Sequence, residues 1–553
     1  MTDREAFVCR RAALRLAWAA FGSLSAAEEA LGAPAFHGPL PPEPRAFGTT
    51  DRLPKDDPRL PTAVTDVLVV GSGAAGAAAA VEARKAGAQV LVIEKMGSLG
   101  GNSVIAQGLM SVPGTPMQRA FGVEDSPEAF AADMLRVSYC GHPGHIALLA
   151  REALSTWKWT VEELGVRWTP DRVEQEIEQS RPRAVVIASG SGAGLMYPLL
   201  DRARALGAGF VLNEQVVRLL ERPNDGRIFG VIVRNTRSGR LRRILARRGV
   251  VLAAGGFGAD VAFRSFCNAR LSERVGTTTQ PGSTSEVLRE AARVGARTIH
   301  LQYIFCIPDA NPDEKGWGAT WQFSRYAAGA QGLWVVRQTG ERFTNEMGST
   351  EERTNAVFDC LRAGRDMVAV ADARAARHPR STIFGRDDVE NLVARGFVMK
   401  FPTLEALAHE LGIPFKRLSE EVDQYNDALA KKAHYDRMGR AVNPVAEPMG
   451  EGPWYAAPLT AKVLLCGGGV AVDLRARVIA AEDDDPVPGL YAAGEITGGL
   501  HGIGYLGSCS LLDALVFGRI AGREAAAEHD GRIPDPGEVQ TDSALRADLF
   551  DFL

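Results

Sequence analysis

The stretch "TDVLVVGSGAAGAAAAVEARKAGAQVLVIEK", residues 65–95, limits the folds open to this chain more than any other part of its sequence. An apolar run ends in a glycine turn formed by Gly71, Gly73 and Gly76, and an alanine-rich run leads to a second apolar run. This order predicts a buried strand, a tight turn, a helix lying close on the sheet and a parallel second strand. Since the start of such a helix presents N–H groups to a pyrophosphate, we expect a dinucleotide site here.

Further glycine-rich segments indicate which dinucleotide is bound. Glu94 ends the second strand about 20 residues after the turn, where a carboxylate can accept hydrogen bonds from a ribose. The loop "KMGSLGGNSVIAQG" follows directly, and "VVLAAGGFG" (250–258) and "PGLYAAGE" (488–495) also end apolar runs in glycine. A nicotinamide cofactor has no use for three separated loops, whereas FAD, buried along its whole length, does. We therefore predict bound FAD.

The length of the chain, 553 residues, exceeds what one ordinary core supports, so we expect more than one packed unit. Strand and helix patterns at both ends flank a middle stretch of aromatic residues, short strands and charged helices. A Rossmann-like α/β domain interrupted by an inserted α+β domain fits this order. We place the α/β domain at 61–299 and 454–530, the insert at 300–453, an N-terminal extension at 1–60 and a tail at 531–553.

Charge and cysteine usage exclude several kinds of partner. The formal net charge is −4, with Lys and Arg scattered, so nothing favours nucleic acid. The seven cysteines are far apart and form no CxxC or Cys/His cluster, which disfavours a metal, haem or iron–sulfur centre. We expect the thiols to be reduced. Any electrons that this protein transfers must come from an external donor or go to an external acceptor.

The N-terminus leaves the location of the protein open. Arg10 and Arg11 precede a weakly apolar stretch, as in a twin-arginine export signal, although Asp3, Glu5 and Arg15 depart from that pattern. An amphipathic surface helix is the alternative. The sequence contains no run of about 18 uncharged apolar residues, so we predict no membrane-spanning helix. We expect a cytoplasmic protein, with export of the folded chain as the alternative, and the sequence leaves the oligomeric state open.

Four motifs together resemble one family: the glycine turn with Glu94, "GGNSVIAQG", "VVLAAGGFG" and "GLYAAGE…GRIAG". Over roughly residues 65–527 the chain is similar to the FAD-binding superfamily of fumarate reductase and succinate dehydrogenase flavoproteins and 3-ketosteroid dehydrogenases. The resemblance implies that the insert is a capping domain and that a small-molecule substrate lies between it and the flavin. Succinate dehydrogenases tether FAD through a histidine in the loop that here reads Asn102-Ser103, so the resemblance implies non-covalent FAD.

The resemblance also assigns the residues that contact FAD. In the family, the last glycine loop leads into a helix aimed at the flavin, and an acidic residue, here Glu495, lies near the ribityl chain. The N-terminus of that helix would stabilise anionic reduced flavin at its N1/O2 edge. The expected cofactor residues are Gly71, Gly73, Ala74, Ala75, Gly76, Glu94, Lys95, Gly100, Gly101, Asn102, Ser103, Gly108, Ala254, Gly255, Gly256, Gly494, Glu495, Ser510, Leu511 and Leu512.

The loop "HGIGYLGSC", residues 501–509, carries the substrate prediction. Fumarate reductases have an arginine that clamps a substrate carboxylate where this chain has Tyr505, and a second carboxylate contact corresponds to Leu465. The tyrosine instead resembles the 3-ketosteroid dehydrogenases, which polarise a substrate ketone with it. By that resemblance Tyr505 binds a carbonyl oxygen, Ser508 relays a proton and the Cys509 N–H is a second donor. The alternative is that Tyr505 is a packed loop aromatic.

The acid or base is less closely defined. Family members carry Arg or Tyr shortly after the Asn-Glu of "GERFTNE", residues 340–346, and a direct count leads to Thr350. Arg353 could take that position after an insertion of two or three residues, and Glu351 or Glu352 could act as a base. A solvated charged turn is the alternative.

These features predict an FAD-dependent oxidoreductase that acts on a C–C or C=C bond next to a carbonyl. The main expectation is α,β-dehydrogenation of an apolar cyclic ketone of ketosteroid type. The alternatives are an ene-reductase of fumarate or urocanate type, with Arg353 as its acid, and a non-catalytic FAD-binding protein. Aromatic residues of the insert suit a flat apolar substrate or form a core; they are Trp317, Trp321, Phe323, Tyr326 and Trp334.

Overall fold

The computed structural model describes residues 57, 59–176, 178–377, 389–443 and 447–528. The possible export signal at Arg10-Arg11 and the predicted tail at 531–553 lie outside these residues.

The described chain divides into two compact units. The nucleotide unit comprises the described parts of 47–272, 279–305 and 465–553, and the insert unit comprises those of 273–278 and 306–464. Within the described ranges, no helix is long and apolar enough to cross a lipid bilayer.

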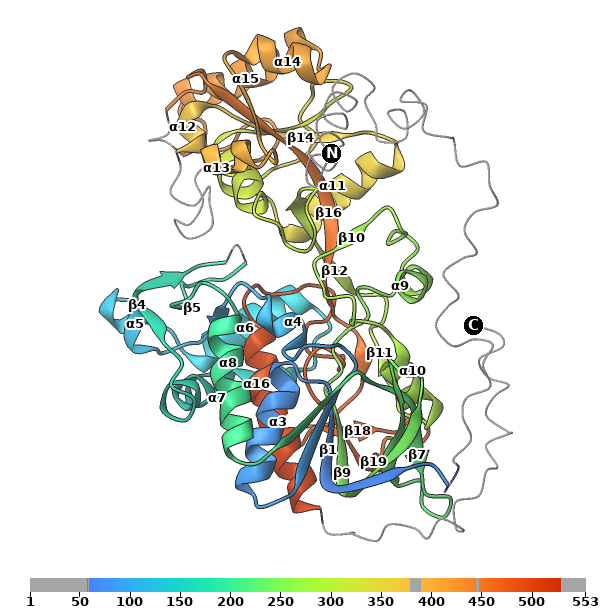
Figure 1. The fold of residues 1–553 in the computed structure, drawn as a ribbon. Helices are drawn as coiled ribbons and strands as arrows, with labels where there is room; N and C mark the ends of the chain where they lie inside the picture. Colours follow the sequence, from blue (N-terminus) through green and yellow to red (C-terminus); the bar gives the residue numbers. More distant parts are fainter. Residues whose placement is uncertain (1–56, 58, 177, 378–388, 444–446, 529–553) are drawn as a thin grey trace, which may run out of the picture. The chain divides into compact units, whose positions relative to one another are not determined.

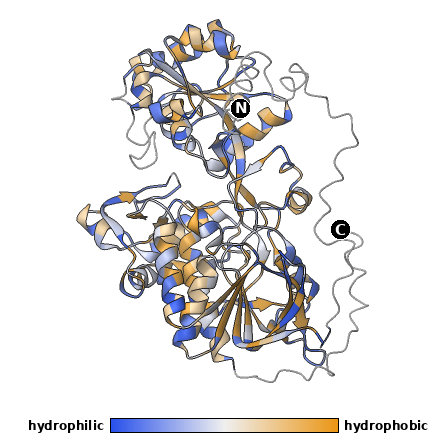
Figure 2. Cartoon of the chain, viewed as in Figure 1, coloured by the Kyte–Doolittle hydropathy of each residue, from blue (hydrophilic) through white to orange (hydrophobic). Residues whose placement is uncertain are grey.

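A mixed sheet of eight strands forms the centre of the nucleotide unit (Figure 1). Strand β1 pairs in parallel with β2, Val67 opposite Val90, and with β9, Leu68 opposite Val250. Val67, Leu68 and Val69 are fully buried, as expected of a strand covered on both faces. Figure 2 shows the hydrophobic colour of these central strands. The strands are β1 (Thr62–Val70), β2 (Val90–Glu94), β6 (Gly209–Leu212), β7 (Glu214–Glu221), β8 (Ile228–Asn235), β9 (Leu241–Leu252), β18 (Arg477–Ile479) and β19 (Pro486–Ala492).

Helices α3 (Ala74–Lys85) and α16 (Ser510–Ala527) pack against this sheet, α8 (Ala193–Ala205) packs on α3, and α7 (Pro143–Glu162) packs on α16 (Figure 1). The backbones of α3 and α16 meet at small residues. A Cβ added at Gly518 would lie 2.4 Å from the Ala75 carbonyl oxygen, and one at Gly522 would lie 2.2 Å from that of Ala79. The alanine run therefore serves two contacts, one with the sheet and one with the C-terminal helix, and the start of α3 lies beside the middle of α16.

Smaller elements complete the nucleotide unit. A three-stranded sheet of β3, β5 and β4 is supported by a buried ion-pair cluster in which Arg183 bonds Asp125 at 2.9 Å and Asp133 at 2.5 Å. The elements are α4 (Gly101–Val104), β3 (Leu109–Ser111), α5 (Pro116–Ala120), α6 (Pro127–Ser138), β4 (Trp168–Glu174), β5 (Ala184–Ile187), α9 (Val261–Cys267), α10 (Glu286–Arg293), β11 (Thr298–Ile299) and β17 (Gly469–Val470).

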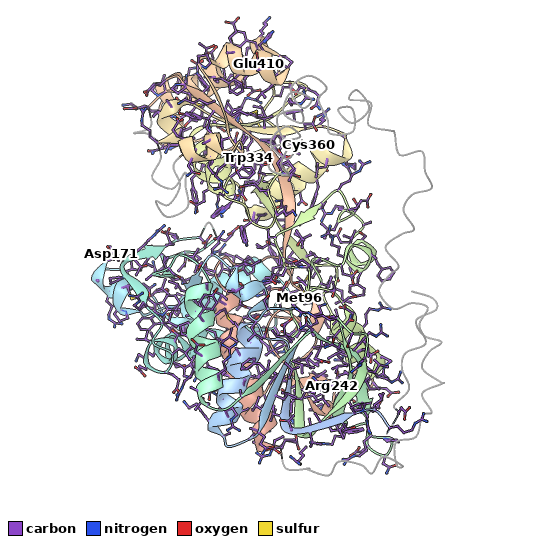
Figure 3. The ribbon with its side chains drawn as sticks, in the orientation of Figure 1. Met96, Asp171, Arg242, Trp334, Cys360 and Glu410 are labelled. Atoms are coloured by element: carbon purple, nitrogen blue, oxygen red, sulfur yellow. The ribbon has the colours of Figure 1, made fainter. Side chains whose placement is uncertain are left out.

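The insert unit is built on antiparallel strands. Strand β14 pairs with β13 and β16, and Val335, Val368 and Ala456 are fully buried between the sheet and helices α14 and α15. Trp334, labelled in Figure 3, lies in the interior of this unit on β13. The elements are β10 (Gly276–Thr277), β12 (Ile304–Ala310), the π-helix η1 (Phe323–Gly329), β13 (Leu333–Val336), α11 (Thr350–Arg362), β14 (Met367–Ala371), α12 (Ala373–Ala376), α13 (Val389–Ala394), β15 (Met399–Phe401), α14 (Leu404–Leu411), α15 (Phe415–Ala430) and β16 (Trp454–Cys466).

Candidate functional site

The turn between β1 and α3 accepts only glycine at two positions. Gly71 has φ +106°, and a Cβ there would lie 2.2 Å from the Ala253 carbonyl oxygen. A Cβ at Gly76 would lie 2.0 Å from the Gly71 carbonyl oxygen. Gly73 is the N-cap of α3, has no capping side chain of its own, and is followed by a first turn without an acidic residue. The positive end of the helix dipole is thus not offset by a carboxylate on this helix, which suits a pyrophosphate.

Glu94 lies at the end of β2 in a small polar cluster. Its Oε2 accepts hydrogen bonds from the Ser72 N–H at 3.2 Å and the Ser72 hydroxyl at 2.7 Å. Its Oε1 accepts one at 2.9 Å from the N–H of Met96, a residue labelled in Figure 3. The Gly100 N–H donates to the Ser72 hydroxyl at 3.1 Å, so the second glycine loop joins the cluster. A carboxylate fixed at this edge of a parallel sheet is placed to accept hydrogen bonds from a ribose.

Asn102 connects three segments that are far apart in the sequence. Its Oδ1 accepts a hydrogen bond from the Gln280 N–H at 2.8 Å, and its Nδ2 donates to Glu495 at 3.3 Å. Glu495 also accepts hydrogen bonds from the N–H groups of Cys466, at 2.9 Å, and Gly256. Burial raises the pKa of the Glu495 carboxyl above its ordinary value. The loops expected to surround one long cofactor therefore meet around these two side chains.

Helix α16 begins at Ser510 without a side-chain cap from its N-cap residue Cys509. Its first turn contains one acidic residue, Asp513. Burial, together with the charge of Glu495, raises the pKa of Asp513 to about 7, so the carboxyl is largely protonated below neutral pH. Burial also raises the pKa of the Cys509 thiol to about 12. Below about pH 7 the positive end of the α16 dipole is consequently little opposed by the side chains of its own first turn.

Tyr505 stands directly before this helix end. Its hydroxyl donates to the Ser510 hydroxyl at 3.2 Å and accepts from the Ser510 N–H at 3.4 Å. The ring packs against His501, with centroids 5.1 Å apart, and against Phe305, at 5.8 Å. Burial raises the pKa of the Tyr505 phenol and lowers that of His501 to about 4. At neutral pH the loop presents a protonated phenol and an uncharged imidazole.

Arg353 belongs to the insert unit, where it is held in the first turn of α11. The side chain is buried and donates to the Gly348 carbonyl oxygen at 3.1 Å and to Asp309 at 3.4 Å. Its guanidinium lies 5.7 Å from the centroid of the Trp334 ring. Thr350, the position reached by direct counting, is the first residue of the helix. All these contacts are typical of a residue that anchors a helix end as well as of one held for catalysis.

Comparison with known proteins decides the family. A family profile described as an FAD binding domain matches residues 66–511. The chain belongs to this family. The flavoprotein is 33% identical to the acrylate reductase flavoprotein subunit of Shewanella woodyi, over 83% of this chain and 90% of the relative. It is 30% identical to the urocanate reductase of Eggerthella lenta, over 85% of this chain and 76% of the relative.

Solved structures agree with this assignment. The flavoprotein matches the open conformation of a flavocytochrome c3 fumarate reductase with a TM-score of 0.71 and 28% identity, over 84% of this chain and 78% of the other. It matches a 3-ketosteroid dehydrogenase of Rhodococcus jostii with a TM-score of 0.66 and 24% identity, over 84% of this chain and 97% of the other. This match shows a likeness of fold. The protein is an FAD-dependent oxidoreductase of the type that acts on CH–CH groups.

The predicted site residues fall into two groups. Ala74 and Ser103 meet, since the Ala74 N–H donates to the Ser103 hydroxyl at 3.1 Å, and the glycines of the turn, Glu94, Asn102 and Glu495 join them as described. Lys95 forms an ion pair with another residue: its ammonium lies 3.2 Å from the Glu286 carboxylate. The backbones at Gly100, Gly101, Gly108, Gly255 and Gly494 have positive φ, and Ala75, Leu511 and Leu512 are buried.

Sequence reasoning missed several residues of this region. Ser72 binds Glu94, and Gln280 donates its side-chain amide to the Gly101 carbonyl oxygen at 2.7 Å. Glu176 accepts a hydrogen bond from the Ser508 hydroxyl at 3.1 Å. The position of Ser72 within the glycine turn is a signal that could have found it. Nothing in the sequence around Glu176 or Gln280 indicates these contacts.

Proposed function

We propose that this flavoprotein is an ene-reductase that reduces a C=C bond conjugated to an uncharged carbonyl group, with Tyr505 as the hydrogen-bond donor to the carbonyl oxygen. The observation that carries the proposal is the Tyr505 phenol, which is protonated and stands at the N-terminus of α16. The names of the relatives, an acrylate reductase and a urocanate reductase, support the direction of reduction. Bound FAD would supply the hydride chemistry.

The residues present fit FAD. The uncompensated start of α3 suits the pyrophosphate, Glu94 suits the ribose, and the start of α16 suits a group on which negative charge develops. We place the flavin ring at the α16 end, and no histidine stands at Asn102-Ser103 to tether it. Binding without a covalent link is therefore part of the proposal.

Tyr505 can stabilise the charge that forms when a conjugated C=C bond is reduced. Addition of hydride to the β carbon moves negative charge to the carbonyl oxygen, and a donor fixed there lowers the barrier. The phenol O–H donates to the Ser510 hydroxyl, and the Ser510 N–H donates to the phenol oxygen. If the O–H turns to a substrate oxygen, the Ser510 N–H still binds the phenol oxygen. Such a chain of donors polarises each O–H and N–H along it.

The charges on the segment that carries Tyr505 favour an uncharged substrate group. From residue 465 to residue 518 the only basic side chains are Arg475 and Arg477, and both pair with carboxylates: Arg475 with Glu524 and Arg477 with Asp473. His501 stays neutral above its pKa of about 4. A carboxylate without a cationic partner is costly to bury, whereas a ketone, aldehyde or ester carbonyl is not. We therefore propose enones, enals or unsaturated esters as substrates, ahead of fumarate or acrylate.

A second candidate is the reverse direction, α,β-dehydrogenation of a cyclic ketone. Tyr505 favours it, because a phenol that stabilises an enolate serves the removal of a proton next to a ketone equally well. The reductase alternative with Arg353 as acid remains a third, and it requires a carboxylate-binding cation that the loop 501–509 does not supply.

The test is an anaerobic assay with a reduced viologen dye as electron donor and matched pairs of substrates. Methyl acrylate carries an uncharged ester where acrylate carries a carboxylate, and cyclohexenone adds an enone. We expect turnover with the ester and the enone and at least about tenfold lower kcat/KM with acrylate, fumarate and urocanate, the ratio that one missing ion pair produces. Faster turnover of the acids would overturn the proposed substrate class.

A further inference from the structure

Ser508 has a backbone conformation that side chains disfavour. Its φ is +65°, in the left-handed region, and it lies between Tyr505 and the first residue of α16, Ser510. For a residue other than glycine this conformation costs free energy, which the surrounding contacts must offset. The strain lies at the joint between the proposed substrate donor and the helix end.

Three residues hold this joint, and we call Ser111, Glu176 and Gln179 the 508 clamp. The Ser508 hydroxyl donates to Glu176 Oε1 at 3.1 Å, and the Ser111 N–H donates to the Ser508 carbonyl oxygen at 2.8 Å. The Gly507 carbonyl oxygen accepts from the Ser111 hydroxyl at 3.1 Å and from the Gln179 amide at 3.2 Å. The Gln179 amide also donates to the Ser111 hydroxyl at 2.7 Å.

Glu176 makes a further contact that a smaller side chain would lose. A Cβ added at Gly507 would lie 2.7 Å from Glu176 Cγ, so the stem of the glutamate lies directly on the Gly507 backbone. The carbonyl oxygens of Gly507 and Ser508 and the Ser508 hydroxyl are thus all hydrogen-bonded to the clamp. Since the phenol of Tyr505 bonds back to Ser510, rotation at Ser508 would move the phenol and the N–H groups of the helix together.

We propose that Glu176 is a positioning residue: through Ser508 it keeps the N–H groups at the start of α16 aimed at the flavin and the Tyr505 phenol at the substrate. The flavin part of this inference rests on the proposed placement of the ring at the α16 end. The charge of Glu176 acts against this role, because a nearby carboxylate disfavours an anion at the same helix end. The geometry and the charge of Glu176 therefore have opposite effects on the reduced flavin, and substitutions can separate them.

The flavin midpoint potential of the purified holoenzyme, measured by equilibration with a reference dye, is the readout. Glu176→Gln keeps the stem and an acceptor for the Ser508 hydroxyl but removes the negative charge. The ratio of reduced to oxidised flavin at a fixed potential should therefore stay equal or rise. Glu176→Ala removes the hydrogen bond and the stem, and the same ratio should fall about tenfold, the effect of losing a well-aimed helix end. Glu178→Ala, two residues away, should leave the ratio unchanged.

A second substitution separates positioning from general damage. Glycine adopts φ +65° without strain, so Ser508→Gly combined with Glu176→Ala should recover most of the lost ratio. If Glu176→Ala raises the ratio as Glu176→Gln does, charge alone acts and the inference is wrong. If Glu176→Ala does not change it, or Ser508→Gly gives no recovery, the inference is also wrong. The potential needs no substrate, so failure of the ester and enone assay would leave this result standing.

Discussion

The Tyr505 hydroxyl lies 3.2 Å from the Ser510 hydroxyl and 3.4 Å from the Ser510 N–H, so the phenol is fixed to the first turn of α16. Tyr505→Phe removes the O–H and keeps the ring packed against His501 and Phe305. We expect unchanged FAD content and a decrease in kcat of about 10² to 10³, as for other single donors to a developing oxyanion. Steady-state rates with methyl acrylate and cyclohexenone check this, and a rate within a factor of two of the original would exclude Tyr505 as the donor.

Tyr505→Arg should change the preferred substrate. A guanidinium in this loop can bind a carboxylate through two parallel hydrogen bonds, which a phenol cannot. We expect the ratio of kcat/KM for acrylate to that for methyl acrylate to rise at least about tenfold. Tyr505→Lys is the matched control, because it adds the positive charge but cannot form two parallel hydrogen bonds to a carboxylate. An unchanged ratio in both variants would mean that the activating group binds elsewhere.

The glycine turn offers a pair of substitutions that separate backbone strain from steric overlap. Gly71 and Gly87 have φ of +106° and +82°, but a Cβ at Gly71 meets the Ala253 carbonyl oxygen at 2.2 Å, whereas one at Gly87 has open space. Gly87→Ala should lower the free energy of unfolding by about 1–2 kcal/mol, the strain alone. In Gly71→Ala, steric overlap should lower the free energy of unfolding by about 1–3 kcal/mol more. We also expect this variant to lose bound FAD. Denaturant titration and flavin content measure both effects, and equal losses would contradict this account.

The pH dependence of stability should report Asp513. Its pKa is raised to about 7 in the folded protein, against an ordinary value of about 4. As the pH rises from about 4 to about 7, the unfolded chain releases this proton and the folded chain keeps it, so the folded state loses stability over that range. Asp513→Asn removes this proton release and keeps the shape. The decrease in Tm of the holoenzyme between pH 5 and pH 8 should therefore be smaller in the variant, and an equal decrease would contradict the assignment.

Arg353 and Asp309 form a buried ion pair within the insert unit. Arg353→Met leaves the carboxylate buried without this partner and should cost about 3–5 kcal/mol of stability. Arg353→Met combined with Asp309→Leu should recover most of it, because an apolar pair avoids the cost of an unpaired charge. If Arg353 only anchors α11, activity recovers with stability. Recovered stability with kcat still reduced about 10²-fold would instead make Arg353 the proton donor.

The sequence predicted the parts of the site that depend on contiguous residues. The order strand, glycine turn, alanine helix and Glu94 fixes β1, α3 and β2, because each step has a local physical reason. Asn102, in the second glycine loop, contacts Glu495, and the role of both in binding FAD stays a prediction. The contact between Glu176 and Ser508 joins residues 332 positions apart, and neither residue stands in a pattern that indicates the other.

The direction of the reaction was the least predictable feature. Tyr505 led the sequence analysis to a ketone dehydrogenase, whereas the relatives' names favour the reductases given there as the alternative. A phenol at a carbonyl oxygen stabilises the same enolate in either direction, so the residue alone does not distinguish oxidation from reduction. The predicted insert at 300–453 overlaps the insert unit, which the structure divides at 306–464 with 273–278.

One measurement tests the central claim most directly. The holoenzyme is reduced anaerobically with stoichiometric dithionite, and the return of the yellow flavin absorbance is followed after mixing with methyl acrylate, cyclohexenone, acrylate or fumarate. We predict rapid return with the ester and the enone, slow return with the two acids, and a rate about 10² lower with the ester in Tyr505→Phe. Return with acrylate or fumarate at the faster rate, or bleaching of the oxidised enzyme by saturated cyclohexanone without any return by the enone, would contradict it.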